Sequence, residues 1–387
     1  MKPKITSQKE VKPARTISRA TEVELWARAA GRCEFDGCNE LLYKSPVTQE
    51  RVNIAQKAHI YSFSPAGPRG RGVFIKDTTG LNEVGNLALV CYGCHKKIDS
   101  DKKGERYSAK LIKFWKEEHE KRVQIVTEIK ATKQSEVIFY HAKIGDERSP
   151  MSFPDAVEAM FPERYPKDER PTNLSMVSED DDSTVEYWET ESRNLKKAFE
   201  RQLRERIGKG DVEHCSVFAF APQPLLIQLG TLLTDKVDAA VYQLHREPRN
   251  WKWQPHEEGF AFNLKVPADT SGAPVLAFSL SAKIASERIS AAVEGNISVW
   301  EMSVTGPNND ILKSNLQLSM FREAARKALV AIRAVHPQAE ELKIFPAMPI
   351  ACAVELGRIR SPKADLPWSI FDQNNKHRRF IPALAIK

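Results

Sequence analysis

The 387-residue sequence has few cysteines, no long apolar run and none of the usual glycine-rich phosphate loops. No stretch of about 18 apolar residues occurs, so the sequence predicts no membrane-spanning helix. The first residues, Met1 to Lys4, lack the apolar core of a secretory signal peptide. The motif G-x-G-x-x-G and the P-loop are both missing, which argues against a dinucleotide-binding enzyme and an NTPase. We therefore expect a cytoplasmic protein that has no membrane partner.

Four of the six cysteines form two closely spaced pairs. These are Cys33-x4-Cys38 and Cys91-x2-Cys94, with 52 residues between the pairs. Thiolates are soft ligands, and four of them suit one tetrahedral structural Zn²⁺. The remaining cysteines, Cys215 and Cys352, stand in apolar surroundings and are predicted to be free, buried thiols in a reducing compartment.

Between and beside the cysteine pairs lie His59, Asn86 and His95, with Asp99 four residues further on. With the two pairs, this order resembles the HNH endonucleases of ββα-metal fold, in the subset that carries a cysteine-knuckle zinc. The resemblance implies that His59 is the general base and that His95 holds a catalytic Mg²⁺ or Mn²⁺. Asn86 would either hold the strand of the base against its partner or orient His59.

The rest of the catalytic ligand set is open. Ala58 stands where many HNH enzymes have a second ligand, which leaves Asp99 and Gln56 as candidates. Asp99 lies one helical turn beyond His95 and can face the same ion, although an acid in a first turn is also a common helix-start residue. The alternative for the whole segment is a zinc-stabilised nucleic-acid-binding module without catalysis, in which His59 and His95 are structural.

The net charge of +7 is unevenly distributed. Residues 1–130 contain 25 Lys and Arg against 16 Asp and Glu, a balance of +9, whereas residues 131–387 contain 33 against 35, a balance of −2. A basic excess in the segment with the HNH pattern is expected of a domain that binds double-stranded DNA. On the loop over 64–72, Arg69 and Arg71 could bind DNA phosphates or simply be solvated.

Residues 1–130 and 131–387 are predicted to be separate domains. In the first, we expect helices over 21–30, 95–100 and 108–130 and strands over 52–63 and 86–90. In the second, strands are predicted over 137–140, 215–221, 239–245, 260–266, 275–280, 297–304 and 342–346, and helices over 154–160, 190–207, 225–233, 286–292 and 315–335, with a last helix or turn over 349–356. The segment 161–182 is predicted to be a long loop whose acidic run, 179–182, either binds a cation or is solvated. Alternating strands and helices predict an α/β fold with a mostly parallel sheet.

Three segments of the second domain resemble the SAVED family: Phe218 to Leu225, Asp238 to Arg246 and Trp251-Lys252-Trp253. The resemblance implies two fused Rossmann-like (CARF-like) units that bind a cyclic oligonucleotide. An HNH domain followed by a SAVED domain is similar to the effector nucleases of bacterial CBASS antiphage systems. That similarity implies a cyclic dinucleotide activator, with a cyclic GMP-AMP isomer as one candidate, and a homo-oligomer, dimer to tetramer, that cuts DNA. A modification-dependent HNH restriction endonuclease is the alternative.

In open α/β sheets a ligand binds beyond the carboxyl ends of the strands. Bases stack on indole faces and phosphates pair with Arg or Lys, so we expect the messenger there. The alternative for Trp251 and Trp253 is that they are hydrophobic anchors of a β-ribbon. The predicted ligand-binding residues are Pro222, Gln223, His245, Arg246, Arg249, Trp251, Lys252, Trp253, Lys283 and Asn308.

Overall fold

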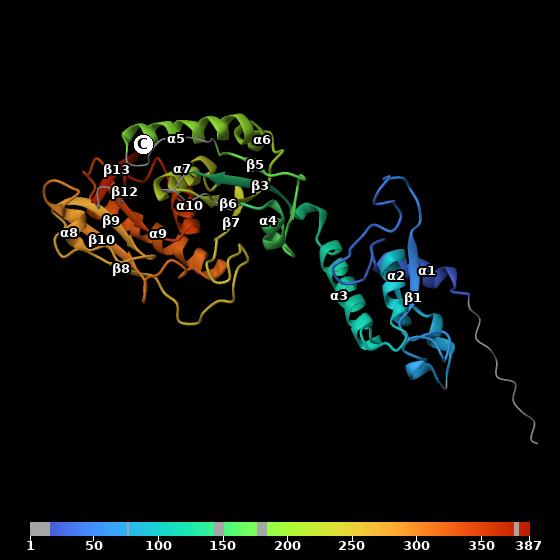
Figure 1. Cartoon of the computed structure of the whole chain (residues 1–387). Helices are drawn as coiled ribbons and strands as arrows, with labels where there is room; N and C mark the ends of the chain where they lie inside the picture. The colour runs from blue at the N-terminus through green and yellow to red at the C-terminus, as the bar shows by residue number, and fades with distance from the viewer. Residues whose placement is uncertain (1–15, 76, 143–150, 176–183, 375–378) are drawn as a thin grey trace, which may run out of the picture. The chain divides into compact units, whose positions relative to one another are not determined.

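The computed structural model describes residues 16–75, 77–142, 151–175, 184–374 and 379–387. The chain divides into two compact units, Met1–Lys130 and Ala131–Lys387 (Figure 1). The acidic run at 179–182 lies outside the described residues. Among those residues, no helix is both long enough and apolar enough to span a bilayer.

The first unit is built on a two-stranded antiparallel sheet, in which His59 pairs with Leu87 and Ala55 pairs with Cys91. Its helices begin at side-chain caps: the Ser18 and Ser108 hydroxyls accept backbone N–H groups in the first turns of α1 and α3. Apolar side chains from the strands and helices form one core beneath the sheet. The elements are α1 (Arg19–Arg28), β1 (Ala55–His59), β2 (Leu87–Cys91), α2 (Tyr92–Ser100) and α3 (Ala109–Thr127), with 3-10 turns at Gly72–Ile75, Thr79–Asn82 and Val84–Asn86.

The second unit contains two sheets. The first has the order β4-β3-β6-β7, with β5 also beside β3, and all its strand pairs are parallel. The second has the order β13-β12-β11-β9-β10-β8, parallel in its centre and antiparallel at both edges. The strands are β3 (Gln134–His141), β4 (Tyr165–Pro166), β5 (Thr172–Asn173), β6 (His214–Phe220), β7 (Asp238–Val241), β8 (Asn263–Lys265), β9 (Ala273–Ser279), β10 (Ile297–Ser303), β11 (Leu342–Ala347), β12 (Trp368–Asn374) and β13 (Arg379–Ile386).

Helices α7 and α10 join the two sheets. Helix α7 follows β6 of the first sheet but contacts β11, β12 and β13 of the second, and α10 follows β11 of the second sheet but contacts β6 and β7 of the first. One buried cluster therefore contains side chains from both sheets. The helices are α4 (Phe153–Met160), α5 (Val185–Phe199), α6 (Glu205–Gly208), α7 (Gln223–Leu233), α8 (Ser286–Ser290), α9 (Asn315–Val335) and α10 (Ile350–Arg358), with a π-helical turn at Glu200–Arg204.

Two glycines let α7 and α10 pack backbone to backbone. A Cβ at Gly357 would lie 1.9 Å from the backbone oxygen of Ile227, and a Cβ at Gly230 would lie 2.0 Å from that of Val354. No side chain larger than hydrogen fits at either position without moving a helix.

Most predicted elements are found within a few residues, but several regions differ from the predictions. The segment 161–182, predicted to be a long loop, contains the short strands β4 and β5 beside β3. The strand expected over 52–63 covers only Ala55–His59, and the strand expected over 239–245 ends at Val241, where the chain leaves the sheet. The hairpin of β12 and β13 was missed, so the second sheet is larger than predicted.

Candidate functional site

The four cysteines of the two predicted pairs lie together. Their sulfurs all lie within 4.8 Å of one another, and the Cys38 and Cys91 sulfurs are 3.9 Å apart. A tetrahedral ion with bonds of about 2.3 Å separates its ligands by about 3.8 Å, so this cluster fits Zn²⁺. Backbone N–H groups also reach the sulfurs, since Cys91 N donates to Cys33 Sγ over 3.3 Å and Cys94 N donates to Cys91 Sγ over 3.4 Å.

Burial disfavours the thiolates of Cys33 and Cys94 unless a cation is bound, whereas for the more exposed Cys38 burial is outweighed by hydrogen bonds, which lower its pKa. Burial raises the pKa of the Cys33 thiol far above its usual range and that of Cys94 to about 12. A bound dication reverses this effect, because a coordinating thiol loses its proton. Cys215 and Cys352 are buried and free, and neither belongs to the cluster.

Glu34 follows Cys33 and connects the first cysteine pair to strand β2. Its buried carboxylate accepts the Leu89 backbone N–H over 2.6 Å and lies 3.6 Å from the Lys116 ammonium of α3. Burial raises the pKa of Glu34 to about 7, against the effect of Lys116. Sequence reasoning missed this residue, because a single acid beside a cysteine has no distinctive spacing.

His59 is the last residue of β1 and is half-buried. Its Nε2 lies 3.0 Å from the Oδ1 of Asn82, an asparagine that the sequence analysis did not single out. Since an amide oxygen only accepts, this contact assigns the proton to Nε2 and leaves Nδ1 as the basic nitrogen. Asn82 is therefore placed to orient the imidazole.

The contacts of Asn86 fit the first of its two predicted roles, which stays a prediction. It is buried, its Oδ1 accepts the Tyr61 N–H over 2.8 Å, and its Nδ2 donates to the carbonyls of Tyr61 and Leu81. These bonds hold the chain just beyond His59 against the segment that precedes β2. The side chain in hydrogen-bond contact with the His59 ring is that of Asn82.

His95 and Asp99 lie together on α2, with Nδ1 of the histidine 3.3 Å from a carboxylate oxygen. Both are partly exposed, so both could bind a cation from solvent. Among the described residues, the cysteine cluster is the one group of three or more Cys, His, Asp or Glu close enough for a metal. Within the part of the chain that the structure describes, His95 and Asp99 thus lie together with no third His, Cys, Asp or Glu close enough to share an ion with them. Gln56 is half-buried on β1, and Ala58 faces the core.

Arg69 connects the strand of His59 to α2. Its guanidinium donates to the carbonyls of Ile60 (2.7 Å), His59 (3.1 Å) and Ile98 (3.4 Å). One side chain thus spans from the end of β1 to the last turn of α2, the helix that carries His95. These contacts favour a structural role over phosphate binding. Arg71 likewise donates to the Phe63 carbonyl.

In the second unit, two glutamines join the carboxyl ends of strands from the two sheets. Gln223, after β6, accepts the Met348 N–H after β11, and Gln243, after β7, accepts the Ala351 N–H, each over 3.2 Å. The predicted ligand edges of both sheets therefore meet. Gln223 uses its carbonyl in this contact, and Pro222 is buried as the residue that begins α7.

The predicted ligand-binding residues of the second unit fall into a buried group and an exposed group. His245 is fully buried, and Trp251 packs edge-on against Phe218 in the core, so neither offers a face to a ligand. Trp251 is a hydrophobic anchor, as in the alternative, but in the core and outside any strand rather than in a β-ribbon, and Trp253 is half-buried against the same cluster. Exposed side chains remain at Arg246, Arg249, Lys252, Lys283 and Asn308.

Asp310, another residue that the sequence analysis missed, holds the two predicted ligand loops together. Its carboxylate accepts the Arg246 N–H over 3.1 Å and the Lys313 ammonium over 2.5 Å, and lies 3.7 Å from Nδ1 of His245. Burial lowers the pKa of His245, so the imidazole is neutral at physiological pH. This contact joins the loop after β7 to the loop after β10.

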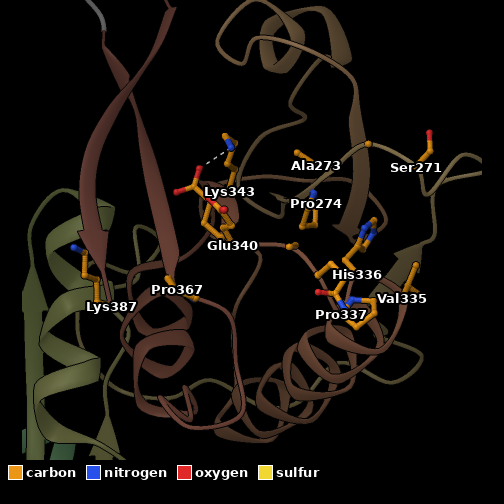
Figure 2. A pocket seen from close by; sticks show the side chains of 14 residues that line it. Ser271, Ala273, Pro274, Val335, His336, Pro337, Glu340, Lys343, Pro367 and Lys387 are labelled. Atoms are coloured by element: carbon orange, nitrogen blue, oxygen red, sulfur yellow. Dashed lines mark hydrogen bonds and ion pairs between the residues drawn. The ribbon is translucent and has the colours of Figure 1, made fainter.

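A cavity of about 880 Å³ lies at the amino ends of β9 and β11, at the end of the second sheet opposite to the carboxyl ends of its parallel strands (Figure 2). It includes Pro274, His336 and Pro367, and Lys343 at its wall is paired with Glu341 over 2.6 Å. None of the predicted ligand residues lines it.

Comparison with known proteins finds a family for part of the chain. Among curated proteins, none matches it. Two solved structures of the Acinetobacter baumannii Cap4 SAVED/CARF-domain-containing receptor, one with the cyclic trinucleotide 2′3′3′-cAAA and one with 3′3′3′-cAAA, each match with a TM-score of 0.42 and 11% identity over 76% of this chain. The Cap4 receptor of Moraxella osloensis matches with a TM-score of 0.38 and 11% identity, also over 76% of this chain.

This chain covers 65% of the length of the first two structures and 64% of the third, less than two thirds in each case. A family model gives the more direct assignment: it is described as the SMODS-associated and fused to various effectors sensor domain, SAVED, and it matches residues 195–386. That segment contains β6 to β13, with both ligand-edge glutamines. Residues 195–386 of this chain are a SAVED domain.

Proposed function

We propose that this chain is a metal-dependent HNH endonuclease that a cyclic oligonucleotide activates, in CBASS-type bacterial antiphage defence. The observation that carries the nuclease proposal is the order and contacts of the first unit: β1 ends at His59, β2 pairs with it, and α2 follows with His95 and Asp99. The SAVED match supports the sensor, because the family is described as a sensor domain fused to effectors.

In the proposed reaction, Nδ1 of His59 takes the proton of a water that attacks a DNA phosphate. The Oδ1 of Asn82 accepts a hydrogen bond from the Nε2–H of His59 and so holds the ring as it becomes positively charged. His95 and Asp99 would hold Mg²⁺ or Mn²⁺, which supplies positive charge at the departing oxygen. A structural Zn²⁺ on the four cysteines would fix the turn between β2 and α2. The +9 balance of residues 1–130 suits a polyanionic substrate.

We place the messenger at the joined carboxyl edges of the two sheets. Arg246, Arg249 and Lys283 are exposed cations in loops there, suited to phosphates. Lys252 is also exposed but is paired with Glu158 over 2.5 Å, so a phosphate would have to compete with that carboxylate. Asn308 follows β10, and Trp253 offers the one partly exposed indole of its loop. We propose a cyclic dinucleotide, with a cyclic GMP-AMP isomer as one candidate. The two ligand-bound Cap4 structures contain cyclic trinucleotides, so any test of binding must include both cyclic dinucleotides and cyclic trinucleotides.

Activation requires that the messenger bind the active state more tightly than the resting state. We propose that this active state is a homo-oligomer, dimer to tetramer, in which nuclease domains pair on double-stranded DNA. Particle size measured with and without messenger tests this step separately from cleavage.

The central experiment is plasmid cleavage with Mg²⁺, with and without a panel of cyclic di- and trinucleotides. We expect cleavage only with both metal and messenger, and none from His59→Ala at unchanged melting temperature. Arg249→Glu should weaken activation, whereas Arg193→Glu, an equally exposed charge reversal on α5, should not. Messenger-independent cleavage that depends on the source of the DNA would favour a modification-dependent restriction enzyme. DNA binding without cleavage in any metal would leave a zinc-stabilised binding module.

A further inference from the structure

Two residues that the sequence analysis did not single out, His141 and Ser175, meet at the carboxyl edge of the first sheet. His141 is the last residue of β3, and Ser175 follows shortly after the end of β5. The Ser175 hydroxyl oxygen accepts the backbone N–H of His141 over 2.8 Å and lies 2.7 Å from Nδ1 of the same residue. Two contacts to one hydroxyl therefore fix the imidazole relative to its own strand.

These contacts leave one nitrogen of the His141 ring for a ligand. The Ser175 hydroxyl has no other acceptor among the described residues, so its hydrogen points to Nδ1 and the ring proton is on Nε2. Nε2 has no hydrogen-bond partner among the described residues, and it is not one of the buried polar atoms that lack one. Burial lowers the pKa of His141, so the ring is neutral at physiological pH. His141 is thus a fixed, neutral hydrogen-bond donor.

Phe220 places an aromatic ring beside this donor. Strands β3 and β6 are parallel neighbours, and His141 pairs with Phe220 in their register (Figure 1). Paired residues of parallel strands point to the same side of a sheet. His141 and Phe220 therefore continue the face of Phe139 and Phe218, whose ring centroids are 6.0 Å apart. Both His141 and Phe220 are only half-buried.

The same face of the first sheet carries the loop in which we place the messenger. Trp251 of that loop packs edge-on against Phe218, and it belongs to one buried cluster with Phe139. His141 and Phe220 lie on this face and at the carboxyl end of their strands, which is the proposed messenger edge.

An aromatic ring beside a fixed N–H donor is suited to a base rather than to a phosphate. Bases stack on aromatic side chains, and N7 of either purine accepts a hydrogen bond. A neutral imidazole offers no charge to a phosphate, whereas Arg246, Arg249 and Lys283 offer it from loops at the joined edges.

We infer that a purine of the cyclic oligonucleotide stacks on Phe220 and accepts a hydrogen bond at N7 from Nε2 of His141. The inference rests on the proposed messenger site and names the part of the messenger that is recognised there. Ser175 is a positioning residue, because it acts only through the imidazole.

Calorimetric titration of the full chain tests this contact. The probes are the isomers of cyclic GMP-AMP and 3′3′3′-cAAA, each with counterparts in which carbon replaces N7 of one purine at a time. The wild-type chain should bind one counterpart about 2- to 12-fold more weakly than the native probe, as expected for one hydrogen bond. His141→Phe keeps an aromatic ring without the donor, so it should bind both equally. Ser175→Ala frees the ring and should reduce the discrimination.

Two further variants complete the test. Phe220→Leu should weaken binding of the native probe and of the counterpart alike, by about fivefold or more, because a stacking surface is lost. His214→Phe is the matched control: it is the same substitution on a histidine whose Nδ1 lies 2.8 Å from a serine hydroxyl, at the amino end of β6. It should change the affinity by less than about twofold and leave the discrimination intact.

The possible failures are distinguishable. If the wild-type chain binds a native probe but none of its N7 counterparts more weakly, the inference is overturned and the proposed sensor stands. Equal weakening by His141→Phe and His214→Phe likewise overturns it, since the loss is then general. If no probe binds the wild-type chain, the messenger proposal fails and the inference fails with it.

Discussion

The contact between His59 and Asn82 gives the sharpest test of the proposed nuclease. Replacing Asn82 with alanine removes the carbonyl that lies 3.0 Å from Nε2 of His59. The imidazole becomes a cation when it takes the proton of water, so in the transition state this is a hydrogen bond to a charged group. Such bonds contribute about 1.5–3 kcal/mol, which corresponds to a loss of about 10- to 150-fold in rate.

The measurement is the single-turnover cleavage rate of a short duplex at saturating Mg²⁺ and messenger. Asn82→Asp keeps an acceptor oxygen at the same place and should recover most of the lost rate. Asn53→Ala is the matched control: it is the same substitution on an exposed asparagine whose Oδ1 bonds only the nearby Ala55 N–H. We expect wild-type cleavage from that variant.

Two results would refute this reasoning. If Asn82→Ala cuts at the wild-type rate while His59→Ala is inactive, then the contact does not position the base. If Asn82→Ala and Asn53→Ala lose rate equally, the loss reflects general weakening of the unit rather than the orientation of one ring.

Three further predictions concern stability and metal. Gly357→Ala should lower the free energy of unfolding in urea by about 1–3 kcal/mol or more, because its Cβ would lie 1.9 Å from a backbone oxygen of α7; Gly208→Ala, with open space around its Cβ, should not. Burial lowers the pKa of His214 from 6.5 to about 4, so the unfolded chain binds this proton more readily and stability should fall as the pH drops from 6.5 towards 4, by up to about 3 kcal/mol; His214→Asn should show a shallower loss, and an unchanged pH dependence would contradict the assignment. Elemental analysis should find about one zinc per chain, lost in Cys38→Ser and kept in Cys352→Ala; zinc in both variants would exclude the cluster as its site.

The parts that the sequence predicted well are those in which spacing fixes geometry. The spacing of the two cysteine pairs predicted the sulfur cluster, because two cysteines so close in sequence can bind one metal ion only if a tight turn brings their sulfurs together. A histidine and an aspartate four residues apart on a helix predicted the contact of His95 with Asp99. Buried apolar strands alternating with helices predicted the parallel centre of each sheet.

What the sequence did not reveal depends on contacts between distant segments. Asn82 and Asp310 are ordinary loop residues whose importance comes only from the side chains that folding places beside them. Trp251 was expected to face a ligand because basic residues flank it, yet packing against Phe218 places it in the core. The hairpin of β12 and β13 was missed because Pro362 and Pro367 precede it and polar residues interrupt its apolar pattern.

The exchange of α7 and α10 between the two sheets has a practical consequence for anyone who wishes to dissect the second unit. Each helix follows a strand of one sheet in the sequence and packs on strands of the other. Truncation between β7 and β8 would strip each half of its cover and expose a large apolar surface, so neither fragment should be obtained as a stable, monodisperse sample. Structural studies of the second unit therefore need it whole.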